Sequence, residues 1–155
     1  GLWTIADDSG LEVDALNGEP GVHSARYAGQ KGNYAANNTL LISRLINVPL
    51  ERRSARFRCA MVLSDGHRVL ASAEGTVEGR IIDEARGANG FGYDPHFWFD
   101  ADGMTTAEMT SERKHEISHR GQALRRLCAK LEQVLVGEGQ SWTGAGGIER
   151  IDLNR

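Results

Sequence analysis

The chain has 155 residues and a formal net charge of −3 at pH 7. This length suits one domain with a substantial core, and the acidic balance argues against binding a nucleic-acid polymer, which favours a broad basic face. No apolar run reaches the roughly 18 residues of a membrane span, so no membrane partner is expected. Two cysteines, Cys59 and Cys128, are too few for a disulfide framework, and they predict reduced core thiols in a cytosolic protein.

The first third of the chain predicts two short strands and a helix. An apolar strand is expected over residues 2–6, ended by a turn at Asp7-Asp8-Ser9-Gly10. Alternating apolar and acidic residues predict a second strand over 11–16. Residues 19–31 are rich in glycine and small side chains and predict a loop. Apolar residues then recur at helical spacing over 34–46, which predicts an amphipathic helix.

The middle of the chain predicts a run of strands. Apolar residues alternate with polar ones over 55–63, the pattern of a half-buried strand. Residues 64–67 predict a turn, and strands are expected to continue over 68–73 and 76–82. Gly75, between them, marks a bend or a close backbone contact.

The last third predicts helices and a tail. Residues 87–95 form a glycine-rich loop, and residues 105–108 resemble a capping box that opens a short helix. A long amphipathic helix is expected over 124–135. We expect one domain over 1–136 and a flexible C-terminal tail over 137–155. Strands and helices in mixed order predict an α/β or α+β fold whose sheet contains hairpins.

Adjacent carboxylates at Asp7 and Asp8 form the first candidate site. Carboxylate oxygens are hard ligands that suit Mg²⁺, and an aspartate can also act as a general base. The alternative is that both residues only cap a turn, a position that aspartate favours. The apolar strand that leads into them makes the two interpretations equally attractive.

The glycine-rich loop is the second candidate. Its glycines allow close approach of the backbone to a ligand. Phe91 and Tyr93 could stack on a flat base, and Asp94 lies beside them. The alternative is a loop whose aromatic side chains fill the core.

Five cationic or titratable residues within eight positions form the third candidate: Arg113, Lys114, His115, His119 and Arg120. They precede the long helix, whose N-terminus would favour an anion. Arginine offers a planar fork to a phosphate or a base edge, and lysine offers a point charge. The alternative is a solvated basic helix face, which could also meet an acidic protein partner. An anion site together with a metal site predicts a phosphate ester as substrate.

Four motifs occur in an order that resembles the inosine/xanthosine triphosphate pyrophosphatase family, whose members hydrolyse non-standard purine nucleotides. The resemblance covers residues 2 to about 136. The motifs are Ala6-Asp7-Asp8-Ser9-Gly10-Leu11-Glu12-Val13, Pro20-Gly21-Val22-His23-Ser24-Ala25-Arg26-Tyr27-Ala28-Gly29, Gly90-Phe91-Gly92-Tyr93-Asp94-Pro95, and Lys114 with Ser118-His119-Arg120-Gly121-Gln122-Ala123-Leu124.

This resemblance implies hydrolysis of dITP, ITP and XTP to the monophosphate and pyrophosphate, with Mg²⁺ as cofactor. It also implies a two-lobed α/β fold with a mixed sheet, flanking helices and a cleft active site, and a cytoplasmic homodimer. Asp8 resembles the catalytic proton acceptor and a metal ligand, and Asp7 would support the metal. The implied substrate-binding residues are Ser9, Phe91, Gly92, Tyr93, Asp94, Lys114, His119 and Arg120, of which His119 and Arg120 resemble the pair that reads the purine.

The resemblance also implies an upstream strand and a Thr/Ser-x-Asn-x-x-Lys phosphate loop that no segment of this sequence matches. The sequence opens at Gly1 without methionine. The chain is therefore expected to lack the N-terminal portion of the family domain. The alternative function is accordingly a nucleotide-binding remnant without catalysis.

Overall fold

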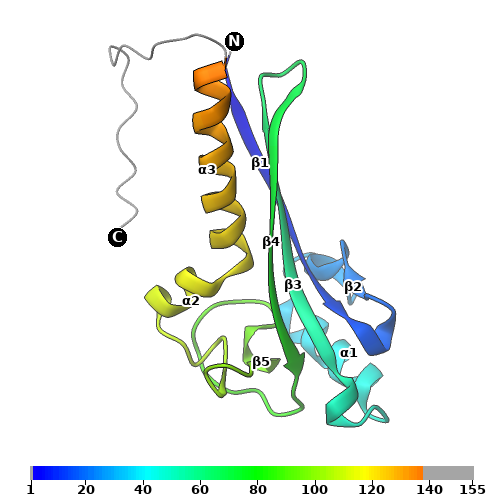
Figure 1. Ribbon diagram of the computed structural model, residues 1–155. Coiled ribbons are helices and arrows are strands. Elements are labelled where there is room, and N and C mark those ends of the chain that lie inside the picture. The colour runs from blue at the N-terminus through cyan, green and yellow to red at the C-terminus, as the bar shows by residue number, and fades with distance from the viewer. Residues whose placement is uncertain (1, 138–155) are drawn as a thin grey trace.

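The computed structural model describes residues 2–137 and contains a six-stranded sheet of order β2-β1-β3-β4-β5-β6 (Figure 1). Every pairing in it is antiparallel. The strands are β1 (Thr4–Val13), β2 (Pro20–Gly21), β3 (Ser54–Ser64), β4 (Val69–Ile81), β5 (Phe97–Phe99) and β6 (Met104–Thr105). The three longest, β1, β3 and β4, form a twisted ribbon that runs the length of the molecule.

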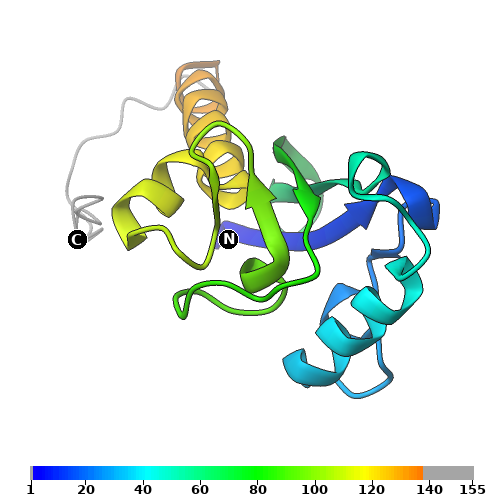
Figure 2. The same ribbon diagram turned by 90° about the horizontal axis from the view of Figure 1, so that it is seen from below.

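Three α-helices pack around this ribbon: α1 (Tyr34–Leu45), α2 (Ser111–Ile117) and α3 (His119–Gly137). Side chains cap two of them, since Asn33 accepts from the backbone of the first turn of α1 and Thr110 does the same for α2. In the view from below, α1 and the α2–α3 pair lie on opposite sides of the segments that carry β4 and β5 (Figure 2). None of the helices in residues 2–137 is long and apolar enough to cross a membrane.

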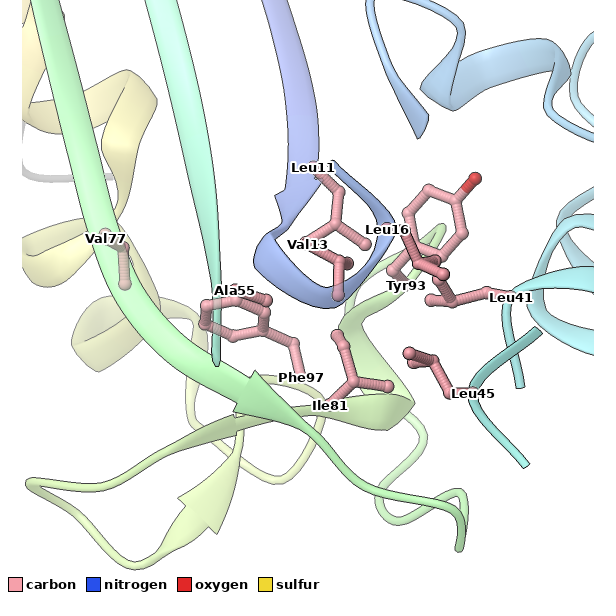
Figure 3. Close-up of a cluster of buried hydrophobic side chains, with 10 residues drawn as sticks. All are labelled: Leu11, Val13, Leu16, Leu41, Leu45, Ala55, Val77, Ile81, Tyr93 and Phe97. Atoms are coloured by element: carbon pink, nitrogen blue, oxygen red, sulfur yellow. The ribbon is translucent and has the colours of Figure 1, made fainter. Parts of the chain in front are cut away.

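Two hydrophobic clusters form the core, one toward each end of the ribbon. The first packs α1 against one end of the sheet (Figure 3), and its buried members are Leu11, Val13, Leu16, Leu41, Leu45, Ala55, Val77, Ile81, Tyr93 and Phe97. The second lies under α3, with Cys59, Met61, Leu63, Ala73, Ala123 and Leu127. Gly75 of β4 allows α3 to approach closely, because a Cβ there would collide with the backbone carbonyl of His119. This confirms the close backbone contact predicted at Gly75.

Several predicted elements are confirmed. The helix over 34–46 is α1, and the strands on either side of the 64–67 turn are β3 and β4, although β4 runs without interruption. Helices flank the sheet as expected. The mixed sheet is wrong for the part of the chain that the structure describes, because its pairings are all antiparallel.

The predicted turn at Asp7-Asp8-Ser9-Gly10 is wrong. These residues lie inside β1, which pairs with β3 at every position and includes the first half of the separate strand predicted over 11–16; the second half, Asp14–Leu16, forms a 3-10 helix. Composition favoured a turn, but ten successive pairings hold the backbone extended. Gly10 serves a close contact with the backbone of Gly21 rather than a turn.

Two further predictions are corrected. Residues 106–108 form a turn, with the Glu108 carboxylate accepting from Thr105 N at 2.7 Å, and the helix begins only at Ser111. Cys59 is a buried core thiol, but Cys128 is exposed on α3. Apart from Gly137, which ends α3, the predicted tail lies outside the described residues.

Candidate active site

A cleft of about 700 Å³ lies between the middle of β1, the loop before β5, and the α2–α3 junction. All the residues predicted for the site line it, although they come from segments far apart in the sequence. They are Asp7, Asp8, Ser9, Phe91, Gly92, Tyr93, Asp94, Lys114, His119 and Arg120.

The acidic segment presents its two carboxylates differently. Asp7 and Ser9 share one face of β1, because side chains alternate along a strand, and Asp8 points the other way. Asp7 Oδ2 accepts from Arg120 Nε at 2.8 Å, and Arg120 Nη2 lies 3.5 Å from Ser9 Oγ. Asp8 is exposed, and its side chain makes no hydrogen bond or ion pair within residues 2–137. Its carboxylate is therefore available for a proton or a cation.

Asp94 anchors the glycine-rich loop. Its residue is 4% exposed, and its Oδ2 accepts from Phe91 N at 2.8 Å and pairs with Lys114 Nζ. Its Oδ1 accepts from the buried Thr106 Oγ1 at 2.8 Å. Gly90, at φ +78°, fits beside this pair because a Cβ there would collide with Asp94. Both oxygens of Asp94 are thus occupied by the protein itself.

The loop places its two aromatic side chains in different environments. Phe91 is 60% exposed, and Lys114 Nζ lies 5.4 Å from its ring centroid. Tyr93 is buried, and its hydroxyl donates to Ser24 O at 2.9 Å. Burial raises the pKa of the Tyr93 phenol. Phe91 is therefore the ring of the loop that is free to stack on a ligand.

His119 is held at the start of α3 by its surroundings. Its ring stacks on Phe57, with centroids 5.1 Å apart and planes 16° apart, and Ser118 caps the first turn behind it. Burial first, and then the charge of Arg120, lowers the pKa of His119 to about 4. The imidazole is therefore neutral at pH 7, with one donor and one acceptor nitrogen.

The cationic cluster divides between the cleft and its outer surface. Arg113 pairs with Asp102 at 2.7 Å and with Glu116 at 2.8 Å, and it does not line the cleft. The other four members of the cluster line the cleft: Lys114, His115, His119 and Arg120. No feature of the sequence marks Thr106 or Phe57 as a site residue, because tertiary contacts alone bring them to the site. Ser24 lies in the second of the four family motifs, but it is not among the predicted site residues.

The residues present fit a magnesium ion only in part. No three metal-ligating side chains come together in the described part of the chain. Asp8 offers one exposed, unpartnered carboxylate, the donor type that Mg²⁺ uses when most of its other ligands are waters and substrate phosphates.

Comparison with known proteins identifies close relatives. Residues 1–130 match the model of the Ham1 family. The dITP/XTP pyrophosphatase of Geobacillus kaustophilus is 49% identical over 137 residues, which are 88% of this chain and 67% of that protein. The dITP/XTP pyrophosphatase of Exiguobacterium sibiricum is 51% identical over 135 residues, 87% of this chain and 68% of that protein.

Solved structures give the same relationship. The Ham1 protein of Staphylococcus aureus superposes with a TM-score of 0.79 at 45% identity, covering 84% of this chain and 67% of that one. The HAM1 protein of Coxiella burnetii has the same TM-score of 0.79 at 41% identity, with 86% and 68% covered. The chain thus spans about two thirds of the length of these proteins.

Proposed function

Because this chain belongs to the Ham1 family, we propose that it hydrolyses the non-standard purine nucleotides dITP, ITP and XTP to the nucleoside monophosphate and pyrophosphate. The observation that carries this proposal is the identity of about half of all aligned residues with dITP/XTP pyrophosphatases over most of the chain. The single cleft that gathers acidic, aromatic and cationic side chains supports it.

Asp8 acts as the general base, accepting a proton from the water that attacks the α-phosphorus. Its exposed and unpartnered carboxylate suits this role. Asp8 would also hold Mg²⁺, and the cation would supply charge neutralisation at the phosphates. The support predicted from Asp7 does not fit this arrangement, because its carboxylate lies on the opposite face of β1. Asp7 is engaged by Arg120 in this structure, so Asp8 is the principal ligand in our proposal.

The purine is read by His119 and Arg120. Arg120 donates to the 6-oxo group of hypoxanthine or xanthine, where adenine carries a donor, and neutral His119 can donate or accept beside it. A site that is built to bond this group disfavours adenine, since the 6-amino donor of adenine would face the Arg120 donor. Lys114 provides positive charge for the nucleotide, Phe91 stacks on its base, and Ser9 contacts it.

Three remaining residues complete the site that we propose. Gly92, Tyr93 and Asp94 hold the nucleotide through the shape of the loop, since Asp94 fixes the Phe91 amide and Tyr93 fixes the loop to Ser24. A cytoplasmic location and a homodimer, both implied by the family resemblance, belong to this proposal as well.

The test is Mg²⁺-dependent release of pyrophosphate from dITP, read as phosphate after addition of inorganic pyrophosphatase. Asp8→Asn should lower kcat at least 100-fold, since general-base catalysis contributes about 10²–10⁴-fold. Asp100→Asn is the matched control, because Asp100 is an exposed carboxylate that does not line the cleft. Equal rates for wild type and Asp8→Asn, with the circular-dichroism spectrum unchanged, would reject the base assignment.

The same preparation distinguishes the alternative function. Thermal stabilisation by dITP without turnover would identify a nucleotide-binding remnant. If dITP neither raises the melting temperature nor is hydrolysed, both the catalytic and the nucleotide-binding functions are contradicted.

A further inference from the structure

Tyr34 lies at the rim of the cleft, and the proposed function does not use it. It is the first residue of α1 and lines the cleft. Its residue is 45% exposed, and its ring centroid lies 6.1 Å from that of Phe91, with the planes 46° apart. Two large aromatic side chains are therefore both partly exposed to solvent and in contact with each other at the same edge of the cleft.

Helix α1 is fixed to the loop that carries Phe91. Asn38 lies four residues after Tyr34 and shares its face of the helix. Its Nδ2 donates to the carbonyl of Gly92 at 3.0 Å, directly beside Phe91. The Asn33 side chain caps the same first turn by accepting from Ala36 N at 3.1 Å. The position of Tyr34 relative to Phe91 is thus set by backbone and helix contacts, not only by the contact between the rings.

A purine has two fused rings and a larger flat face than one phenyl ring can cover. Phe91 alone would leave part of the base in water. The ring of Tyr34, tilted by 46° to that of Phe91, adds a second aromatic contact at the same edge of the cleft. Exposed apolar surface of this kind gains most when a ligand removes it from solvent.

We infer that Tyr34 is a second base-binding aromatic residue of the nucleotide site, which packs against the part of the bound purine that Phe91 leaves uncovered. This inference rests on the proposed function, because it assigns part of the substrate to Tyr34. Tyr34 touches the base and not the phosphates, so it contributes to substrate binding and not to the chemical step.

Steady-state kinetics with dITP, and competitive inhibition by inorganic tripolyphosphate, test this assignment. Tyr34→Ala should raise KM about tenfold, which corresponds to about 1.4 kcal/mol, with kcat within twofold of wild type. Tyr34→Phe keeps the ring and should retain the wild-type KM. Tripolyphosphate carries no base, so its inhibition constant should be the same for all three proteins.

Trp3→Ala is the matched control, since Trp3 is an exposed aromatic residue, at 41%, that does not line the cleft. Its KM should be that of wild type. An unchanged KM in Tyr34→Ala, or an equal loss of affinity for dITP and tripolyphosphate, would overturn the role of Tyr34. The proposed function would still stand in that case, because the wild-type protein hydrolyses dITP. A wild-type protein that neither hydrolyses nor binds dITP would overturn both.

Discussion

Two ion pairs line the cleft, and they differ in how deeply the protein encloses them. The side chains of Asp94 and Lys114 are 6% and 24% exposed, and those of Asp7 and Arg120 are 37% and 50% exposed. Asp94 also accepts from Phe91 N and from Thr106 Oγ1, so it is saturated by protein donors. Asp7 has the Arg120 pair as its one ion pair within the described residues.

This difference separates scaffold from reactive surface. A buried carboxylate with both oxygens engaged holds its loop in one conformation, and its loss leaves a lysine without its counter-charge. An exposed pair contributes little to stability and can exchange one partner for another at low cost. Arg120 can therefore leave Asp7 for a purine or phosphate oxygen, whereas Lys114 meets a ligand while still held by Asp94.

The largest expected effect is on the buried pair. Asp94→Ala should lower the free energy of unfolding by about 3 kcal/mol, since removing one partner of a buried pair costs about 3–5 kcal/mol and Lys114 is partly solvated. Asp7→Ala, the matched control in the exposed pair, should change it by less than about 1 kcal/mol. Urea unfolding followed by tryptophan fluorescence measures both. Equal losses in the two variants would remove the distinction between the pairs.

The second prediction sharpens the comparison with two glycines of one loop. Gly90 and Gly92 have φ of +78° and +64°, so alanine at either position costs about 1–2 kcal/mol of backbone strain. At Gly90 the added Cβ would also collide with Asp94 and approach Lys114 Nζ, whereas at Gly92 it would meet nothing within 4 Å.

Gly90→Ala should therefore be less stable than Gly92→Ala by a further 1–3 kcal/mol or so, the usual cost of overpacking. Urea midpoints of the two variants, with equal slopes, give the difference. Indistinguishable midpoints would mean that the Asp94–Lys114 pair yields easily and does not act as a rigid anchor.

In the exposed region, the site residues are easy to identify from the sequence, but their backbone conformation is not. Asp7, Asp8 and Arg120 could be identified as site residues because their chemistry is visible in the sequence. Their backbone conformation could not be predicted, since an Asp-Asp-Ser-Gly composition favours a turn. The strand is imposed by pairing with β3, fifty residues or so later in the chain, whose alternating pattern was itself predicted correctly.

The buried region shows the opposite balance. The loop over 87–95 and its glycines could be predicted, because glycine-rich composition is local information. Two contacts could not be predicted: the hydrogen bond from Thr106 to Asp94, and the packing of Tyr34 beside Phe91. The resemblance of residues 105–108 to a capping box predicts a helix at Thr106, and the apolar pattern over 34–46 marks Tyr34 only as the start of an amphipathic helix. Both contacts depend on packing between distant segments, which leaves no periodic or compositional signal.

The smallest expected effect concerns His119, where the exposed pair meets the core. Burial and Arg120 lower its pKa from 6.5 to about 4, with Lys114 adding to the effect and Asp94 and Asp7 opposing it. Between these two pH values the unfolded chain binds a proton that the folded chain refuses. Stability from this group is therefore complete above pH 6.5 and is lost as the pH falls toward 4.

Wild-type protein should accordingly lose more stability between pH 7 and pH 4.5 than His119→Asn, whose side chain does not titrate. Urea unfolding at a series of pH values measures the free energy of unfolding of both proteins. The contribution of the carboxylates, which both proteins share, cancels in the difference between them. Identical pH profiles would show that His119 is solvated in the cleft and shares the openness of the neighbouring Asp7–Arg120 pair. A steeper wild-type profile would place the boundary of the rigid region between His119 and Arg120, which are consecutive residues of α3. The neutral imidazole of His119 would then belong to the ordered region, and the guanidinium of Arg120 to the exposed pair that can exchange its partner.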